Sequence, residues 1–86
     1  MNTFQFEIIT PEETFYSGSI SSLVAPGVEG YFGILAHHAP LLARSGGGKI
    51  KVQEAGRERF FQVGPGIVEV LKNRVIFLTR QVRQIA

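Results

Sequence analysis

Cysteine is absent from this chain of 86 residues. Disulfide bonds and thiolate metal sites are therefore excluded, and the fold has to rest on its packed core and on binding partners. No apolar run approaches the roughly 20 residues that a membrane-spanning helix needs, and the first residues carry no basic stretch followed by an apolar segment. If the protein works at a membrane, we expect another subunit to hold it there.

Helical periodicity is also scarce. No window of about eleven residues repeats its apolar positions at intervals of three and four without an interrupting glycine or proline. Strand patterns are present instead. Apolar and polar side chains alternate over residues 4–9, and residues 49–53 place two lysines on one face and Ile50 and Val52 on the other. With 44% hydrophobic and 19% charged residues, the chain has the composition of a folded globular protein, and we expect a single domain over residues 1–86.

Turn signals separate the apolar runs at short intervals. They lie at Thr10-Pro11-Glu12-Glu13, Ser17-Gly18, Pro26-Gly27, Glu54-Ala55-Gly56-Arg57, Gly64-Pro65-Gly66 and Lys72-Asn73-Arg74. This repetition predicts an all-β fold, an antiparallel β-sandwich or flattened barrel of about eight to ten short strands. Residues 80–86 are too few for a stable helix, so we expect them to end the last strand or to form a frayed terminus.

Charge is unevenly distributed along the chain. Residues 1–43 contain no lysine or arginine, whereas residues 44–86 contain all nine. Such asymmetry is typical of proteins with an acidic or nucleic-acid partner, and it gives an alternative function, a small basic β-barrel that binds single-stranded nucleic acid. The residues of that hypothesis are Lys49, Lys51, Arg57, Arg59, Phe60 and Phe61. We prefer the interpretation that these cations occupy solvent-facing strand positions, because no block of like charge forms.

Sites for chemistry are hard to find in the sequence. His37 and His38 are neighbours, and neighbouring side chains of an extended chain point to opposite faces, so we expect structural or interface histidines and no metal site. The glycines at 46–48 lead into a strand pattern, whereas a phosphate loop leads into a helix. No nucleophile elbow accompanies the serines. We therefore nominate no catalytic, cofactor-binding or metal-binding residue and expect a protein that is not an enzyme.

Residues 26–42 read PGVEGYFGILAHHAPLL and resemble the signature segment of the epsilon subunit of F-type (rotary) ATP synthases. The family pattern is Pro-Gly, two residues, Gly, then Phe-Gly-Ile-Leu, followed shortly by His-Ala-Pro-Leu-Leu. Residues 9–12 and 15–18 look like the family's opening strand and first turn, and residues 64–70 look like its late glycine corner. Ala36 stands where the family usually has proline, and Pro65 replaces a common glycine. The resemblance covers the N-terminal β-sandwich domain without the C-terminal helical hairpin, so inhibition and ATP binding by that hairpin are not carried over.

The resemblance implies a non-catalytic central-stalk (rotor) subunit of a proton-translocating ATP synthase, which links the gamma shaft to the membrane proteolipid ring. It implies a peripheral place on the cytoplasmic side of an energy-coupling membrane, with indirect membrane contact and with neither nucleic acid nor a small-molecule substrate as partner. A glycine-shaped loop would face the ring, and a second surface would lie toward the gamma subunit. The loop residues are Glu29, Gly30, Tyr31 and Phe32, and the second surface consists of His38, Ala39, Pro40, Leu41 and Leu42.

Overall fold

The computed structural model describes residues 2–86, so Met1, which the expected domain includes, lies outside the described residues. This part of the chain forms ten strands and no helix. The strands are β1 (Phe4–Ile9), β2 (Thr14–Ile20), β3 (Ser22–Gly27), β4 (Gly30–Leu35), β5 (Leu41–Ser45), β6 (Gly48–Glu54), β7 (Arg57–Val63), β8 (Gly66–Leu71), β9 (Arg74–Thr79) and β10 (Val82–Gln84). Accordingly, residues 2–86 offer no helix that could cross a membrane.

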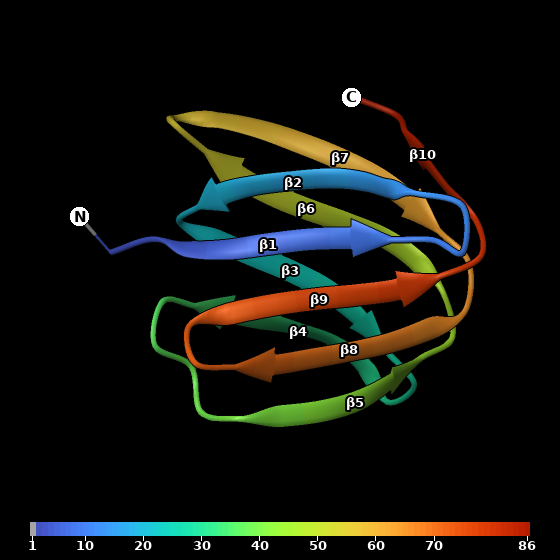
Figure 1. The fold of residues 1–86 in the computed structure, drawn as a ribbon, viewed down its shortest axis with the longest axis horizontal. Helices are drawn as coiled ribbons and strands as arrows, with labels where there is room; N and C mark the ends of the chain where they lie inside the picture. Colours follow the sequence, from blue (N-terminus) through green and yellow to red (C-terminus); the bar gives the residue numbers. More distant parts are fainter. Residues whose placement is uncertain (1) are drawn as a thin grey trace.

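The strands form two five-stranded sheets packed face to face (Figure 1). The first sheet has the order β2-β1-β9-β8-β5, and the second has the order β10-β7-β6-β3-β4. One pair, β1 with β9, is parallel, and the other pairs are antiparallel. The expected β-sandwich is confirmed. Strands β4 and β5 are edge strands of different sheets, and both border the same side of the molecule.

A single apolar cluster fills the space between the sheets. Its largest fully buried side chains include Phe6, Phe61 and Phe77, which come from β1, β7 and β9. Alternation along β6 puts Ile50 and Val52 into this core, as the sequence predicts, because successive strand side chains point to opposite faces. The lysines of the same strand lie on the outer face.

Two predicted hairpins have the expected turns. Ala55 and Gly56 join β6 to β7 with φ values of 51° and 79°, and Lys72 and Asn73 join β8 to β9 with φ values of 52° and 60°. Positive φ at both central residues is the mark of a type I′ turn, which matches the twist of the flanking strands.

The turn predicted at Ser17-Gly18 is wrong, because both residues lie inside β2. Gly18 pairs with Phe6 on β1, and a Cβ on Gly18 would lie 2.7 Å from Tyr16 Oη and 3.0 Å from Glu54 Oε2. The glycine is therefore required for close packing between the sheets, since any larger residue would displace these two side chains.

The prediction for residues 80–86 is also wrong, because β9 ends at Thr79 and the chain then crosses to the other sheet. There β10 pairs antiparallel with β7, and Ile85 N–H donates to the Phe60 carbonyl at 2.9 Å. The crossing is fixed by Thr79 Oγ1, which lies 3.1 Å and 3.0 Å from the carbonyl oxygens of Gly64 and Pro65. A three-residue strand carries too little alternation to be recognised from sequence.

Candidate partner-binding surfaces

The first candidate surface is the end of the β3–β4 hairpin. Gly27 and Gly30 form the last pair of the hairpin, and only Val28 and Glu29 lie in the turn between them. Gly30 has φ of 130°, a conformation that favours glycine. Val28 N–H donates to the Arg44 carbonyl on β5 at 3.1 Å, so the turn is fastened to the opposite sheet. We call Val28 and Glu29 the hairpin tip.

Tyr31 and Phe32 were expected in a loop, and the structure places both inside β4. Tyr31 lies on the outer face and is 60% exposed, and its Oη accepts a hydrogen bond from Lys49 N–H at 3.2 Å. Phe32 points the other way and packs against the core as a half-buried side chain. The loop is shorter than expected because the hairpin pairs as far as Gly30. Val28 is 66% exposed at this turn, and it was not predicted as a site residue although it belongs to the motif of residues 26–42.

The second candidate surface follows β4 at its other end. Residues 36–40 connect β4 to β5, and Leu41 and Leu42 begin β5. Leu41 packs against the core, whereas Leu42 lies on the outer face and is 73% exposed. Ala39 and Pro40 are exposed as well. Of the five residues predicted for this surface, these three offer apolar contact to a partner, and we call Ala39, Pro40 and Leu42 the shoulder.

The histidines before the shoulder have different environments. His37 adopts φ of 64°, and its backbone N–H donates to Asn73 Oδ1 at 2.7 Å. The half-buried His38 places Nδ1 2.7 Å from the Ala39 carbonyl oxygen, so this nitrogen donates to it and carries the proton. Nowhere in residues 2–86 do three histidine, aspartate or glutamate side chains group as metal ligands.

The hairpin tip and the shoulder lie at opposite ends of one side of the sandwich (Figure 1). Strand β4 runs from the tip toward the shoulder, and β5 returns from the shoulder to Arg44, which binds the tip. Both surfaces are therefore carried by the same two edge strands, with a hydrogen-bonded sheet behind each of them.

The outer face of the first sheet extends the shoulder with apolar side chains. Ile67, Leu71 and Leu78 are each between 43% and 48% exposed on β8 and β9. A depression of about 790 Å³ lies at the far end of this face, with Ile9, Pro65, Ile67 and Leu78 among its walls. None of these residues was predicted from the sequence as part of a site. The signal was available, because Ile67, Leu71 and Leu78 occupy outward positions of β8 and β9 where strict alternation would put polar residues.

The residues of the nucleic-acid alternative do not form a common surface. Arg59 Nε lies 2.9 Å from Glu54 Oε1, Lys51 Nζ lies 3.2 Å from Glu58 Oε2, and Phe61 is buried in the core. Lys49 Nζ sits 5.7 Å from the centre of the Phe60 ring on the outer face. Two of the four cations are thus paired with carboxylates, and one of the two aromatic rings cannot stack on a base.

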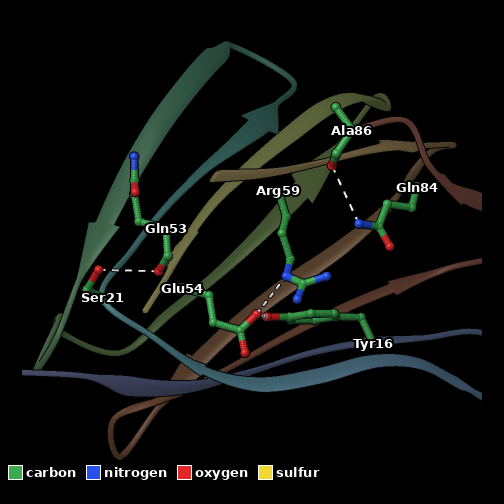
Figure 2. Close-up of polar contacts among 7 residues, drawn as sticks. All are labelled: Tyr16, Ser21, Gln53, Glu54, Arg59, Gln84 and Ala86. Carbon is green, nitrogen blue, oxygen red and sulfur yellow. Dashed lines mark hydrogen bonds and ion pairs between the residues drawn. The ribbon is translucent and has the colours of Figure 1, made fainter. Parts of the chain in front are cut away.

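A polar cluster ties the two sheets together near β2 and β7, away from the edge strands β4 and β5. Figure 2 shows its side chains. Tyr16 Oη on β2 donates to Glu54 Oε1 on β6 at 2.7 Å, and Arg59 on β7 completes the group. Although Arg59 Nε is close to the carboxylate, the N–H is not aimed well enough for a hydrogen bond, so this contact is mainly charge attraction. Burial raises the pKa of the Tyr16 phenol, and the hydrogen bond and negative charge of Glu54 raise it further.

Comparison with known families decides where this sandwich belongs. Residues 3–85 match the β-sandwich domain of the ATP synthase delta/epsilon chain. The chain belongs to this family. An ATP synthase epsilon chain of Chlorobaculum tepidum is 44% identical over 80 residues, which are 92% of this chain and 91% of that protein. An epsilon chain of Leptospira interrogans is 38% identical over 78 residues, but these make up 61% of its length.

Solved structures show the same fold. A chain of the Euglena gracilis mitochondrial ATP synthase superposes with a TM-score of 0.89 at 16% identity, covering 95% of this chain and 53% of that one. A chain of the Tetrahymena thermophila mitochondrial ATP synthase central stalk and c-ring superposes with a TM-score of 0.79 and is covered to 64%. This chain therefore spans between half and two thirds of those structures. The resemblance drawn from residues 26–42 is confirmed at the level of the family, and the partner contacts of individual residues stay predictions.

Proposed function

We propose that this domain is a non-catalytic central-stalk subunit of a proton-translocating ATP synthase, joining the gamma shaft to the membrane proteolipid ring. One observation carries the proposal: two exposed groups, the hairpin tip and the shoulder, lie at opposite ends of the same pair of edge strands. A rotor piece has to hold two neighbours at once and pass torque between them. Hydrogen-bonded sheets packed face to face resist shear between such points.

The hairpin tip is the proposed contact with the ring. Its turn is exposed and tightly fastened, through Gly27 opposite Gly30 and through the Val28 N–H bond to Arg44. Glu29 supplies a carboxylate that suits the polar loops of a ring subunit, and Val28 supplies a small apolar contact beside it. Because the tip is already ordered, little conformational entropy is lost when it binds.

The shoulder is the proposed contact with the gamma subunit. Leu42 is the most exposed large apolar side chain in the described part of the chain, and Leu71 adds a second exposed apolar side chain on β8, while Glu69 lies directly opposite Leu42. An apolar area of this kind is typical of a surface that a partner covers. The opposite outer face carries the charged side chains Lys49, Lys51 and Glu58 together with the exposed Val24, Tyr31 and Leu35.

The proposed location follows from these partners. The domain would be held at the cytoplasmic side of an energy-coupling membrane through the complex, touching the bilayer only indirectly. It would transmit rotation and turn over no substrate, since the exposed groups that we assign serve contact.

Binding to purified gamma subunit tests the proposal. Leu42→Asp puts a charge into the proposed contact and is expected to weaken gamma binding at least about tenfold, since burying an unpaired charge costs more than the roughly 1.4 kcal/mol that a factor of ten represents. Val24→Asp is the matched control, because Val24 is an exposed apolar strand residue on the outer face of the other sheet. Isothermal titration should separate the two variants. Equal loss in both, or no gamma binding by the wild-type domain at micromolar concentration, would contradict the assignment.

A further inference from the structure

Asn73 connects three segments that are far apart in the sequence. It is the second residue of the β8–β9 turn and adopts φ of 60°. Its Oδ1 accepts the His37 backbone N–H at 2.7 Å, and its Nδ2 donates to the Thr3 carbonyl at 2.9 Å. Its own carbonyl accepts Gln5 N–H at 3.3 Å. One side chain thereby fastens the β4–β5 connection to a turn and to the beginning of β1.

The bond to His37 matters because His37 has a conformation that residues other than glycine rarely adopt. A φ of 64° lies in the left-handed region, which an L-residue occupies only when its surroundings favour it. The Asn73 amide supplies such a contact. Without it, the connection gains access to conformations with negative φ at His37, and each of these would aim residues 38–40, which lead into β5, in a different direction.

We propose that Asn73 is a positioning residue for gamma binding: it holds His37 in the left-handed conformation and so presents Ala39 and Pro40 beside Leu42, the shoulder, in one binding-competent arrangement. This inference rests on the proposed function of the shoulder. Asn73 touches no partner in this role, and it acts through the backbone of His37. The chemistry explains the residue type, because the side chain has to accept one hydrogen bond and donate another from a short stem while its own backbone tolerates positive φ.

Three substitutions separate this role from a general effect on stability. Asn73→Gly keeps the turn, because glycine adopts φ of 60° freely, and removes both side-chain bonds. Asn73→Asp keeps the acceptor for His37 and loses the donor to Thr3. Lys72→Gly is the control, since it adds a glycine to the same turn at φ of 52° and leaves the Asn73 side chain in place.

The isolated domain gives the first readout. In Asn73→Gly, amide exchange at His37 should accelerate roughly 3- to 10-fold, the factor expected for loss of one hydrogen bond of ordinary net strength. The ¹⁵N order parameters of residues 37–39 should fall from about 0.85 toward flexible values below about 0.6. Lys72→Gly should leave both unchanged. Unchanged exchange and order in Asn73→Gly would overturn the inference, whether or not the domain binds gamma.

Gamma binding gives the second readout. Asn73→Gly should bind about tenfold more weakly, because only a fraction of the molecules present the competent arrangement. Asn73→Asp should recover most of the affinity, a rescue that a merely stabilising role at Thr3 would not produce. If wild-type and Asn73→Gly domains bind equally well, the positioning role is wrong while the proposed function stands. If the wild-type domain does not bind at all, the proposed function fails and the first readout still decides what Asn73 holds.

Discussion

Glu54 links the two sheets, and replacing it with alanine should destabilise the whole domain. The substitution removes the acceptor of the Tyr16 hydroxyl and the partner of Arg59 in one step. Tyr16 and Arg59 are then left partly buried without their carboxylate partner. The substitution therefore removes contacts that join one sheet to the other.

The size of the effect can be worked from the contacts. A hydrogen bond to a charged acceptor contributes about 1.5 to 3 kcal/mol, and a partly exposed ion pair adds at most about 1 kcal/mol. Glu54 and Arg59 have side chains that are 26% and 37% exposed, so solvent reduces the second contribution. We expect Glu54→Ala to lower the free energy of unfolding by about 2 to 3 kcal/mol. A chain of this length has roughly 4 to 13 kcal/mol in total.

Urea unfolding followed by circular dichroism measures this loss. Glu58→Ala is the control, because Glu58 also pairs with a cation, Lys51 at 3.2 Å, on an exposed surface, and its removal should cost less than about 1 kcal/mol. A double-mutant cycle of Glu54→Ala with Tyr16→Phe measures the coupling between the two side chains. If Glu54→Ala is no less stable than Glu58→Ala, or the cycle shows no coupling, the cluster does not fasten the sheets.

Two further predictions concern the same framework. Because the pKa of Tyr16 in the folded state is raised above its ordinary value of 10.0, Tyr16 contributes its full stabilisation below about pH 10 and loses it progressively at higher pH. The free energy of unfolding in urea should therefore fall more steeply with rising pH for the wild type than for Tyr16→Phe. Parallel pH curves for the two proteins would refute this. A Cβ on Gly66 would overlap the Leu78 carbonyl oxygen, so Gly66→Ala should lower the free energy of unfolding by at least about 3 kcal/mol. Gly46→Ala is the control and should change the thermal midpoint little, because a Cβ on Gly46 would have nothing within 4 Å.

Local signals explain why the sandwich could be predicted. Alternation in β1 and β6 and the short turns at Ala55-Gly56 and Lys72-Asn73 depend only on neighbouring residues, which the sequence displays directly. The prediction of a turn at Ser17-Gly18 was wrong because a glycine can either form a turn or make room for close packing inside a strand. Here it makes room for Tyr16 and for Glu54, which lies 36 positions further along the chain, and no local pattern distinguishes that use from a turn.

The candidate surfaces were predicted less completely than the fold. The family motif pointed to residues 26–42, but it did not reveal that Tyr31 and Phe32 are strand residues or that Val28 is at the tip. Asn73 was placed only in a turn, because its hydrogen bonds reach residues 36 and 70 positions away. Contacts of that range depend on the packing of the two sheets, which the sequence does not display.

The most direct test of the account is whether one copy of the domain can carry gamma subunit onto the proteolipid ring. Purified gamma should sediment with ring-containing liposomes when wild-type domain is added. Gamma should not sediment when either variant replaces the wild-type domain. The Leu42→Asp domain should still bind the liposomes, whereas the Glu29→Arg domain should still bind gamma in solution. If gamma and the ring compete for the domain, or if the two variants lose the same partner, the hairpin tip and the shoulder are not separate attachment points and the central claim is wrong.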